Sequence, residues 1–126
     1  MNEGLERGIR DLVAKDARYS FEAYRFIFEA LDYTVRSIGE RRHVSGRELA
    51  EGIRKFALEQ FGGLARMVFD GWNIRRTDDF GEIVFGMVEA GLMGKTEQDS
   101  KDDFRGVYDF DDAFPRYVPP RTGPAA

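Results

Sequence analysis

Apolar residues recur at the 3.6-residue spacing of an amphipathic helix through most of the first 91 residues, with polar residues between them. This spacing predicts a first helix that ends near residue 15, and then helices over about 21–38, 46–61, 64–70 and 78–90. The strongest start signal is Ser45-Gly-Arg-Glu48, a capping box in which each of the two side chains can bond the other residue's backbone amide. Ser20 and Thr77 are further N-cap candidates, and Gly39 is typical of a helix end.

The pattern changes after Leu92. Between Asp103 and Phe114, charged and aromatic residues alternate loosely, which predicts either a short β-hairpin or a loop anchored by its aromatic side chains. All four prolines follow residue 114, so residues 115–126 are expected to form an extended tail with no core of its own. We therefore predict a mainly α protein, with one compact helical domain of four to five helices over residues 1–114 and a tail at 115–126.

Three glycines lie inside the predicted helices, at Gly52, Gly81 and Gly86. Glycine in a helix interior costs about 1 kcal/mol relative to alanine. Two explanations are open. Either the fold tolerates this loss, or a neighbouring element comes so close that no side chain fits.

Composition limits the class of protein. The 126 residues are 42% hydrophobic and include 11 Phe, 5 Tyr and one Trp, enough for the packed core of one domain. The absence of cysteine excludes disulfides and thiolate chemistry. The first residues do not resemble a signal peptide, and no apolar run reaches the roughly 18 residues that a membrane span needs. We therefore expect a cytoplasmic protein with no membrane segment.

Charge is unevenly distributed along the chain. Residues 1–76 carry 14 Arg or Lys and 12 Asp or Glu, residues 77–126 carry 5 and 11, and the net charge is −4. Most of the basic residues are arginine, which favours forked contacts to carboxylates or phosphates. An acidic chain is a poor general binder of nucleic acid, although a local basic patch can still serve.

No motif of catalysis or cofactor binding is complete. Gly94-Lys-Thr96 matches the end of a phosphate-binding loop, but the first glycine of that loop would fall at Glu89, after a helix rather than a strand. Asp109-Phe-Asp-Asp112 begins like a calcium loop but lacks the central glycine and the closing glutamate. His43 is the single histidine, so no zinc ligand set exists, and Ser45 is better explained as a cap than as a nucleophile. A carboxylate-bound Mg²⁺ stays open, but we expect no enzymatic activity, cofactor or metal.

Two stretches, HVSGRELAEGIRKFALEQFG at residues 43–62 and DFGEIVFGMVEAGLM at residues 79–93, resemble a family of small, uncharacterised bacterial proteins. The resemblance covers about residues 20–114. That family has no assigned activity, so the resemblance implies a bacterial, cytoplasmic context and no particular chemistry.

A looser similarity concerns the order of the elements. The helices at 46–61, 64–70 and 78–90 resemble a winged helix-turn-helix domain, in which the third helix enters the DNA major groove and a β wing, here within 92–114, follows it. The most exposed positions of this third helix are expected to be Asp78, Asp79, Glu82, Gly86 and Glu89. Because DNA phosphates are bound by cations and donors rather than carboxylates, this helix is not expected to dock on DNA.

Two groups of residues are candidates for partner binding. The first is a basic patch near two predicted turns, formed by Arg41, Arg42, His43, Arg47, Arg75 and Arg76. It fits RNA phosphates or an acidic partner, or it is a solvated surface that nearby glutamates partly neutralise. The second is a C-terminal anchor segment, formed by Tyr108, Phe110, Phe114 and Tyr117. Aromatic residues suit a binding hot spot, but packing on the chain's own core is the explanation that we prefer for them.

Two functions follow from these observations. We favour a non-enzymatic protein-interaction module that presents a surface, or its proline-containing tail, to a partner protein. The alternative is a nucleic-acid- or ribosome-associated, winged-helix-like protein that binds through its arginine-rich turns. The salt dependence of binding distinguishes the two functions, because phosphate binding weakens steeply as ionic strength rises.

Overall fold

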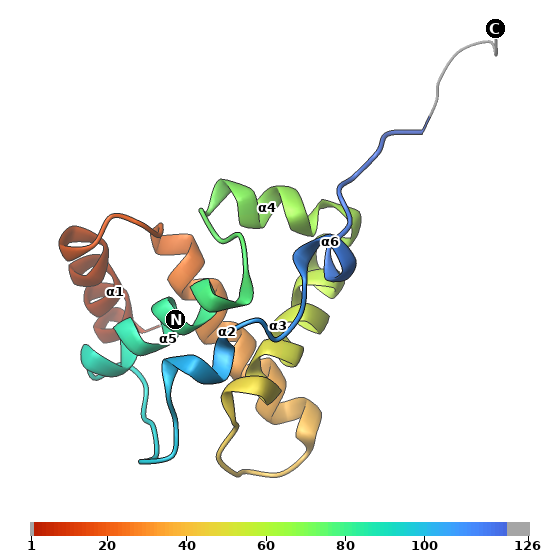
Figure 1. The fold of residues 1–126 in the computed structure, drawn as a ribbon. Coiled ribbons are helices and arrows are strands. Elements are labelled where there is room, and N and C mark those ends of the chain that lie inside the picture. The colour runs from red at the N-terminus through yellow and green to blue at the C-terminus, as the bar shows by residue number, and fades with distance from the viewer. Residues whose placement is uncertain (1, 121–126) are drawn as a thin grey trace, which may run out of the picture.

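Helical segments follow one another along residues 2–120, the part of the chain that the computed structural model describes (Figure 1). The longer helices are α1 (Glu3–Lys15), α2 (Phe21–Ile38), α3 (Gly46–Phe61), α4 (Ala65–Gly71) and α5 (Thr77–Glu89). The short ones are the 3-10 turns η1 (Gly62–Leu64) and η2 (Lys101–Phe104) and the single turn α6 (Phe110–Ala113). The predicted helices and the mainly α class are confirmed. Among residues 2–120, no helix combines the length and apolar character that crossing a membrane requires.

Local sequence signals set the ends of the helices. Ser45 Oγ accepts a hydrogen bond from the Glu48 amide at 3.1 Å, and Glu48 Oε1 accepts one from the Ser45 amide at 3.0 Å, which is the predicted capping box of α3. Ser20 Oγ accepts from the Ala23 amide at the start of α2. Gly39 ends α2 in the left-handed region, with a φ of 84° that favours glycine.

The prediction that Thr77 caps α5 is wrong. Thr77 is the first helical residue, and its side chain is buried between α5 and the C-terminal segment. Its hydroxyl donates to the Phe104 carbonyl at 2.6 Å and accepts from the Val107 amide at 3.0 Å. A buried hydroxyl must find partners inside the fold, so Thr77 joins two segments instead of capping a helix.

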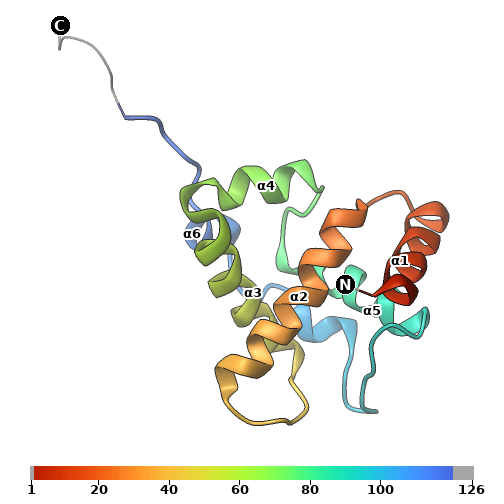
Figure 2. The same ribbon diagram turned by 180° about the vertical axis from the view of Figure 1, so that it is seen from behind.

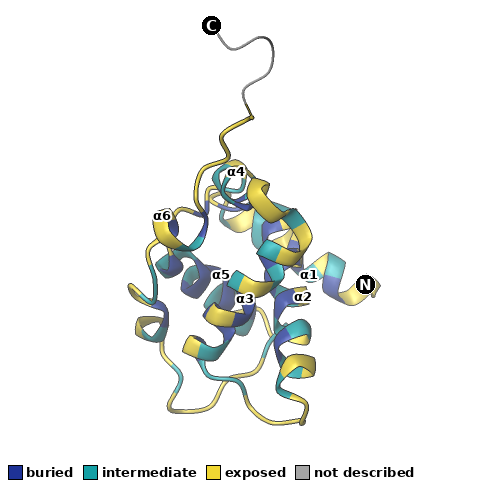
Figure 3. Cartoon of the chain, turned by 90° about the vertical axis from the view of Figure 1, so that its right-hand side faces the viewer, coloured by how far each residue is buried: buried dark blue, intermediate teal, exposed yellow. Residues whose placement is uncertain are grey.

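Helix α5 begins near the middle of the molecule and extends to the edge beside α1 (Figures 1 and 2). It packs against α1, α2, α3 and η2, and its residues Phe80, Ile83 and Met87 are fully buried. Helices α2 and α3 form the most extensively packed pair, while α4 lies across the end of α3 that is farthest from the α2–α3 turn. Figure 3 shows the buried residues gathered between these helices, with exposed residues on the outer turns and along the tail.

Two of the three helical glycines mark close approaches between elements. A methyl group at Gly52 would overlap the Thr34 side chain of α2, and one at Gly81 would lie 3.2 Å from the Lys101 carbonyl oxygen of η2. Gly86 differs, because a methyl group there would lie 3.8 Å from Tyr24, an ordinary contact. Close packing therefore requires glycine at Gly52, leaves little room for a side chain at Gly81 and does not restrict Gly86.

The segment after α5 contains helical turns and no strand between Leu92 and residue 120. Asp103 Oδ2 accepts from the Ser100 amide at 2.9 Å, and Asp109 Oδ1 accepts from the Asp111 amide at 2.7 Å. These caps start η2 and α6 in the place where a β-hairpin was one of two alternatives. The other alternative, anchoring by aromatic side chains, matches the burial of Phe104, Phe110 and Phe114. Residues 115–120 are exposed and follow α6, and the rest of the predicted tail lies outside the described residues.

Candidate functional site

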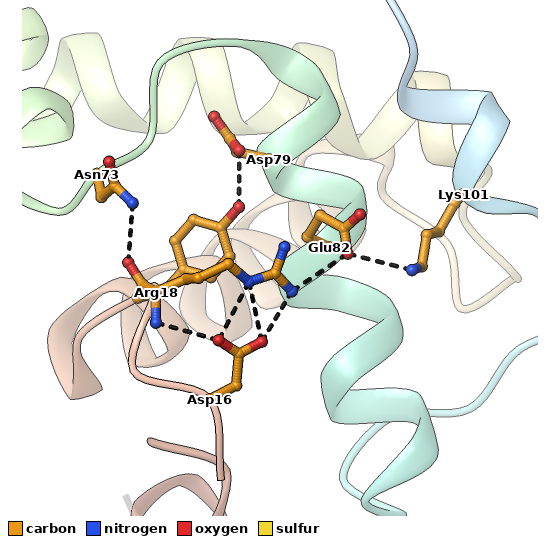
Figure 4. Close-up of polar contacts among 7 residues, drawn as sticks. Asp16, Arg18, Asn73, Asp79, Glu82 and Lys101 are labelled. Atoms are coloured by element: carbon orange, nitrogen blue, oxygen red, sulfur yellow. Dashed lines mark hydrogen bonds and ion pairs between the residues drawn. The ribbon is translucent and has the colours of Figure 1, made fainter. Parts of the chain in front are cut away.

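The first acidic residues of α5 are bonded within the fold (Figure 4). The Tyr19 hydroxyl donates a 2.6 Å hydrogen bond to Asp79 Oδ1, while Asp79 Oδ2 accepts from the Arg75 and Arg76 amides at 2.8 and 3.2 Å. This carboxylate caps α5 and holds the α1–α2 loop and the α4–α5 turn against it. Burial raises the pKa of Tyr19, and the hydrogen bond to Asp79 adds to the effect, so the hydroxyl stays protonated as a donor.

Glu82, one turn further along α5, is also paired (Figure 4). Its Oε2 lies 3.5 Å from Arg18 Nη2 and 3.1 Å from Lys101 Nζ. Asp16 holds the same arginine at 2.7 Å, and the Arg18 carbonyl accepts a 3.1 Å hydrogen bond from the Asn73 side chain. The network ties the α1–α2 loop, the α4–α5 turn and η2 to one face of α5.

The expectation that α5 presents an acidic face to solvent is therefore wrong for most of that face. Of the five positions expected to be most exposed, Glu89 is exposed, whereas Asp78, Asp79, Glu82 and Gly86 are half-buried. A recognition helix must reach into a DNA groove with its outer face free. Both the elements packed around α5 and its acidic charge are unfavourable for this mode of DNA binding.

The basic residues of the predicted patch divide between two separate turns. The α2–α3 turn lies at the bottom of Figures 1 and 2, and the α4–α5 turn lies in the upper half. The first turn, together with the start of α3, carries Arg41, Arg42, His43 and Arg47, and the second carries Arg75 and Arg76. The structure therefore does not gather the six residues into one continuous patch.

Of the three arginines at the α2–α3 turn and the start of α3, Arg42 is neutralised by neighbouring carboxylates. Arg42 forms ion pairs with Glu48 at 2.6 Å and Glu40 at 3.2 Å. The Arg42 guanidinium lowers the pKa of Glu48 to about 2, and the backbone amide that Glu48 accepts in the capping box contributes to the shift. His43 Nε2 lies 2.9 Å from Asp99 Oδ2, which ties this turn to the loop that follows α5.

The arginines of the α4–α5 turn line an open groove of about 770 Å³. We call it the basic groove, after its arginines Arg66, Arg75, Arg76 and Arg105. Arg75 is 64% exposed and Arg105 is 75% exposed. Three aspartates share the groove: Asp78, Asp109 and Asp111.

Three of the four aromatic residues in the predicted anchor segment belong to the protein's own core. Phe110 and Phe114 are buried and contact each other and Phe69, with ring centres 5.0 to 5.7 Å apart. The Tyr108 hydroxyl donates a 2.7 Å hydrogen bond to the Ala50 carbonyl, and burial raises its pKa. Of the four, Tyr117 is the residue that faces solvent, being 49% exposed.

The large apolar side chains that are exposed within residues 2–120 gather in one region. They are Leu64, Met67, Tyr117 and Val118, and we call them the α4–tail surface. Leu64 and Met67 lie on η1 and α4, and the other two follow α6. Figure 1 shows the tail leaving the molecule beside the junction of α3 and α4. The tail segment that carries Tyr117 and Val118 thus begins beside the elements that carry Leu64 and Met67.

Two contacts attach the start of the tail to η1 and α4. The Tyr117 ring lies against Gly63, where an added methyl group would be 3.5 Å from it. Arg116 Nη1 lies 3.0 Å from Asp70 Oδ2. The beginning of the tail is therefore held on η1 and α4, the elements that carry Leu64 and Met67.

Sequence reasoning did not identify Leu64 and Met67 as functional candidates, because a helix over 64–70 is too short for its period to show which apolar residues face outward. The sequence nevertheless contains a signal for the exposure of Met67. Ala65 and Phe69 define the buried face, and Met67 lies on the opposite side of the helix.

Within residues 2–120, no group of three His, Cys, Asp or Glu side chains is placed to hold a metal ion. No protein-family model, curated protein or solved structure matches the chain. Its function is therefore inferred from its own surfaces.

Proposed function

We propose that this protein is a non-enzymatic interaction module that binds a partner protein through the α4–tail surface. The observation that carries the proposal is that Leu64, Met67, Tyr117 and Val118, with exposed fractions of 45 to 81%, lie on two segments that the Tyr117–Gly63 and Arg116–Asp70 contacts bring together. Contiguous exposed apolar side chains are typical of interaction sites, because burying them releases water and contributes about 25 cal/mol per Å².

The shape of this surface also suits a partner. Residues three and four apart share a helix face, so Gly63, Met67 and Gly71 lie along the outer side of η1 and α4. A methyl group at Gly71 would meet no atom within 4 Å. Packing therefore does not require glycine at this position, and the missing side chain leaves the backbone beside Met67 open to a partner.

The experiment is affinity purification of the tagged protein from its host at low salt, with and without nuclease. Wild type is compared with a Met67→Glu/Tyr117→Ser variant, which removes two exposed apolar contacts and leaves the core intact. A matched control, Ala14→Glu/Ala17→Ser, changes two exposed residues at the end of α1, on the side of the molecule opposite α6 (Figure 1).

The proposal predicts a nuclease-resistant partner protein that is captured by the wild type and the control and lost with the Met67→Glu/Tyr117→Ser variant. Equal capture by all three forms contradicts it. Circular dichroism of each form shows that any loss of binding does not come from unfolding.

The second candidate is a nucleic-acid- or ribosome-associated, winged-helix-like protein. The order of α3, α4 and α5 supports it, together with two exposed arginines, Arg41 and Arg47, which form no ion pair within residues 2–120. Capture that is sensitive to nuclease and falls steeply with salt favours this candidate over the first.

The proposal also includes the cellular location of the protein and the boundary between its domain and its tail. As the family resemblance implies, we place it in the bacterial cytoplasm, with residues 1–114 as the domain and residues 115–126 as the tail. Fractionation of the host cell tests the location. Limited proteolysis tests the division, which predicts early cleavage after Phe114 and a stable remainder.

A further inference from the structure

The basic groove adjoins the α4–tail surface. Asp70 of α4 connects the two, because its Oδ2 pairs with Arg116 beside Tyr117 at 3.0 Å and its Oδ1 lies 3.7 Å from Arg75 in the groove. Arg66 also lines the groove, and it belongs to α4, the helix that carries Met67. A partner on the apolar surface therefore lies next to arginine side chains.

The aspartates in the groove are already bonded within the fold. Asp78 Oδ1 accepts from the Gly106 amide at 3.2 Å, and Asp109 Oδ1 accepts from the Asp111 amide at 2.7 Å. Asp111 Oδ1 accepts from Arg66 Nη1 at 2.9 Å. Each carboxylate thus has a structural role that a ligand would have to break.

The arginines at the groove are less engaged. Arg76 is exposed and forms no ion pair within the described residues, and Arg75 has the 3.7 Å contact with Asp70. Arg105 pairs with Asp102 at 3.2 Å, but the two side chains are 75 and 72% exposed, and such surface pairs contribute little. Each guanidinium therefore has N–H donors that are free to bind a carboxylate. Its two parallel donors match the two oxygens of a carboxylate in a bidentate pair.

We propose that the partner of this module is an acidic protein segment that also carries a large apolar residue. The apolar residue covers Met67, and the acidic side chains pair with Arg75, Arg76 and Arg105. This inference rests on the proposed function and specifies the chemistry of the partner.

A peptide fits this site better than a nucleic acid does. The aspartates between the arginines would repel an unbroken row of phosphates. A peptide can place its carboxylates at intervals, opposite the arginines alone. A nucleic acid backbone would also leave the aliphatic side chains of Leu64 and Met67 without an apolar partner.

The test is selection of a phage-displayed library of random short peptides on the full-length wild-type protein. Enriched peptides are then synthesised, and their affinities are measured by fluorescence anisotropy at several salt concentrations. We expect Asp or Glu together with a large apolar residue in the enriched peptides. The Arg75→Glu/Arg76→Glu/Arg105→Glu variant is expected to lower their affinity at least about tenfold, because three attractive charge contacts become repulsive.

The matched control is Arg7→Glu/Lys55→Glu/Lys95→Glu. It changes the net charge by the same amount at three exposed positions on α1, α3 and the loop after α5. Its affinity is expected to stay within about twofold of wild type, because distant exposed charges are screened by salt. A loss in the control equal to that in the groove variant would show that net charge rather than the groove attracts the peptide.

The remaining outcomes separate this inference from the proposed function. If Met67→Glu abolishes peptide binding but the arginine reversal leaves the affinity unchanged, the proposal of an acidic partner is overturned and the proposed interaction surface stands. Peptides indifferent to both sets of changes overturn both proposals. Three further outcomes would each replace the acidic partner with another occupant. They are enrichment of basic or uncharged peptides, tighter binding of a random-sequence RNA at the groove, and a dimer of this chain that is lost with Met67→Glu.

Discussion

Arg116 Nη1 and Asp70 Oδ2 lie 3.0 Å apart, an ion pair between residues 46 positions apart that holds the start of the tail on α4. Asp70 Oδ1 also lies 3.7 Å from Arg66 Nε. That distance is too long for a hydrogen bond, and the buried Nε has no such partner within residues 2–120. One carboxylate therefore faces three arginines: Arg116 in the tail and Arg75 in the basic groove, which are exposed, and Arg66, which is largely buried.

Substitutions at the two ends of this pair are expected to have unequal effects. Arg116→Ala should change the free energy of unfolding by less than about 1 kcal/mol, because Arg116 is 66% exposed and Asp70 keeps its other arginines. Asp70→Ala should cost about 1–3 kcal/mol, because the largely buried Arg66, 12% exposed, loses one of its two neighbouring carboxylates and keeps only Asp111. Urea unfolding measures both values, and equal losses would contradict this account of the site.

Deletion of residues 115–126 is expected to weaken binding of the captured partner while the domain stays folded. The deletion removes Tyr117 and Val118 from the α4–tail surface, and these side chains make no contribution to the buried core. Affinity for the purified partner and the urea midpoint are measured on the same preparation. An unchanged affinity would exclude the tail from the interface.

Gly52→Ala is expected to destabilise the protein by about 1–3 kcal/mol, because the new methyl group overlaps Thr34 where α2 and α3 meet. Gly86→Ala is the matched control. It should be neutral or stabilising by up to about 1 kcal/mol, because its methyl group makes an ordinary contact and alanine favours a helix. Thermal unfolding compares the two variants. A Gly52→Ala/Thr34→Ala double variant should recover part of the loss, and additive losses would contradict the close approach.

The Glu48 carboxylate predicts a pH dependence of stability. Its folded pKa of about 2 lies below its ordinary value of 4.5, so its ionised form stabilises the fold above the unfolded pKa. That contribution is lost as pH falls from about 4.5 through about 2. Glu48→Gln is therefore expected to lose less stability over this range than wild type does. Urea unfolding from neutral to acid pH measures the difference, and an equal loss in Glu48→Gln and wild type would contradict this role of the carboxylate.

The sequence is sufficient to predict the helices but not their neighbours in space. Period and caps placed α1 to α5, and the capping box at Ser45 and Glu48 is present as predicted. Thr77 was misassigned because a hydroxyl at a helix start looks like a cap from the sequence alone. Its real partners, Phe104 and Val107, are 27 and 30 residues away. A local sequence pattern cannot predict contacts between residues so far apart in the sequence.

The same reason limits prediction of the site. The acids of α5 looked exposed because helical spacing places them on one face, whereas Tyr19, Arg18 and Lys101 come from other elements to pair with them. Met67 was overlooked, because its exposure depends on where α4 lies relative to α3 and the tail. The candidate arginines at residues 75–76 were found from sequence, but Arg105, which completes the groove, comes from a different segment.

The most direct measurement is the affinity of the purified partner for a Gly71→Gln variant. Gly71 lies beside Met67 in open space and its φ is not in the left-handed region, so glutamine adds bulk to the interface without strain in the fold. Gly94→Gln, which is also in open space but lies after α5, is the matched control. We predict that Gly71→Gln binds the partner at least about tenfold more weakly than wild type, a loss of about 1.4 kcal/mol, while Gly94→Gln binds normally. Normal binding by Gly71→Gln would contradict the claim that this surface receives the partner.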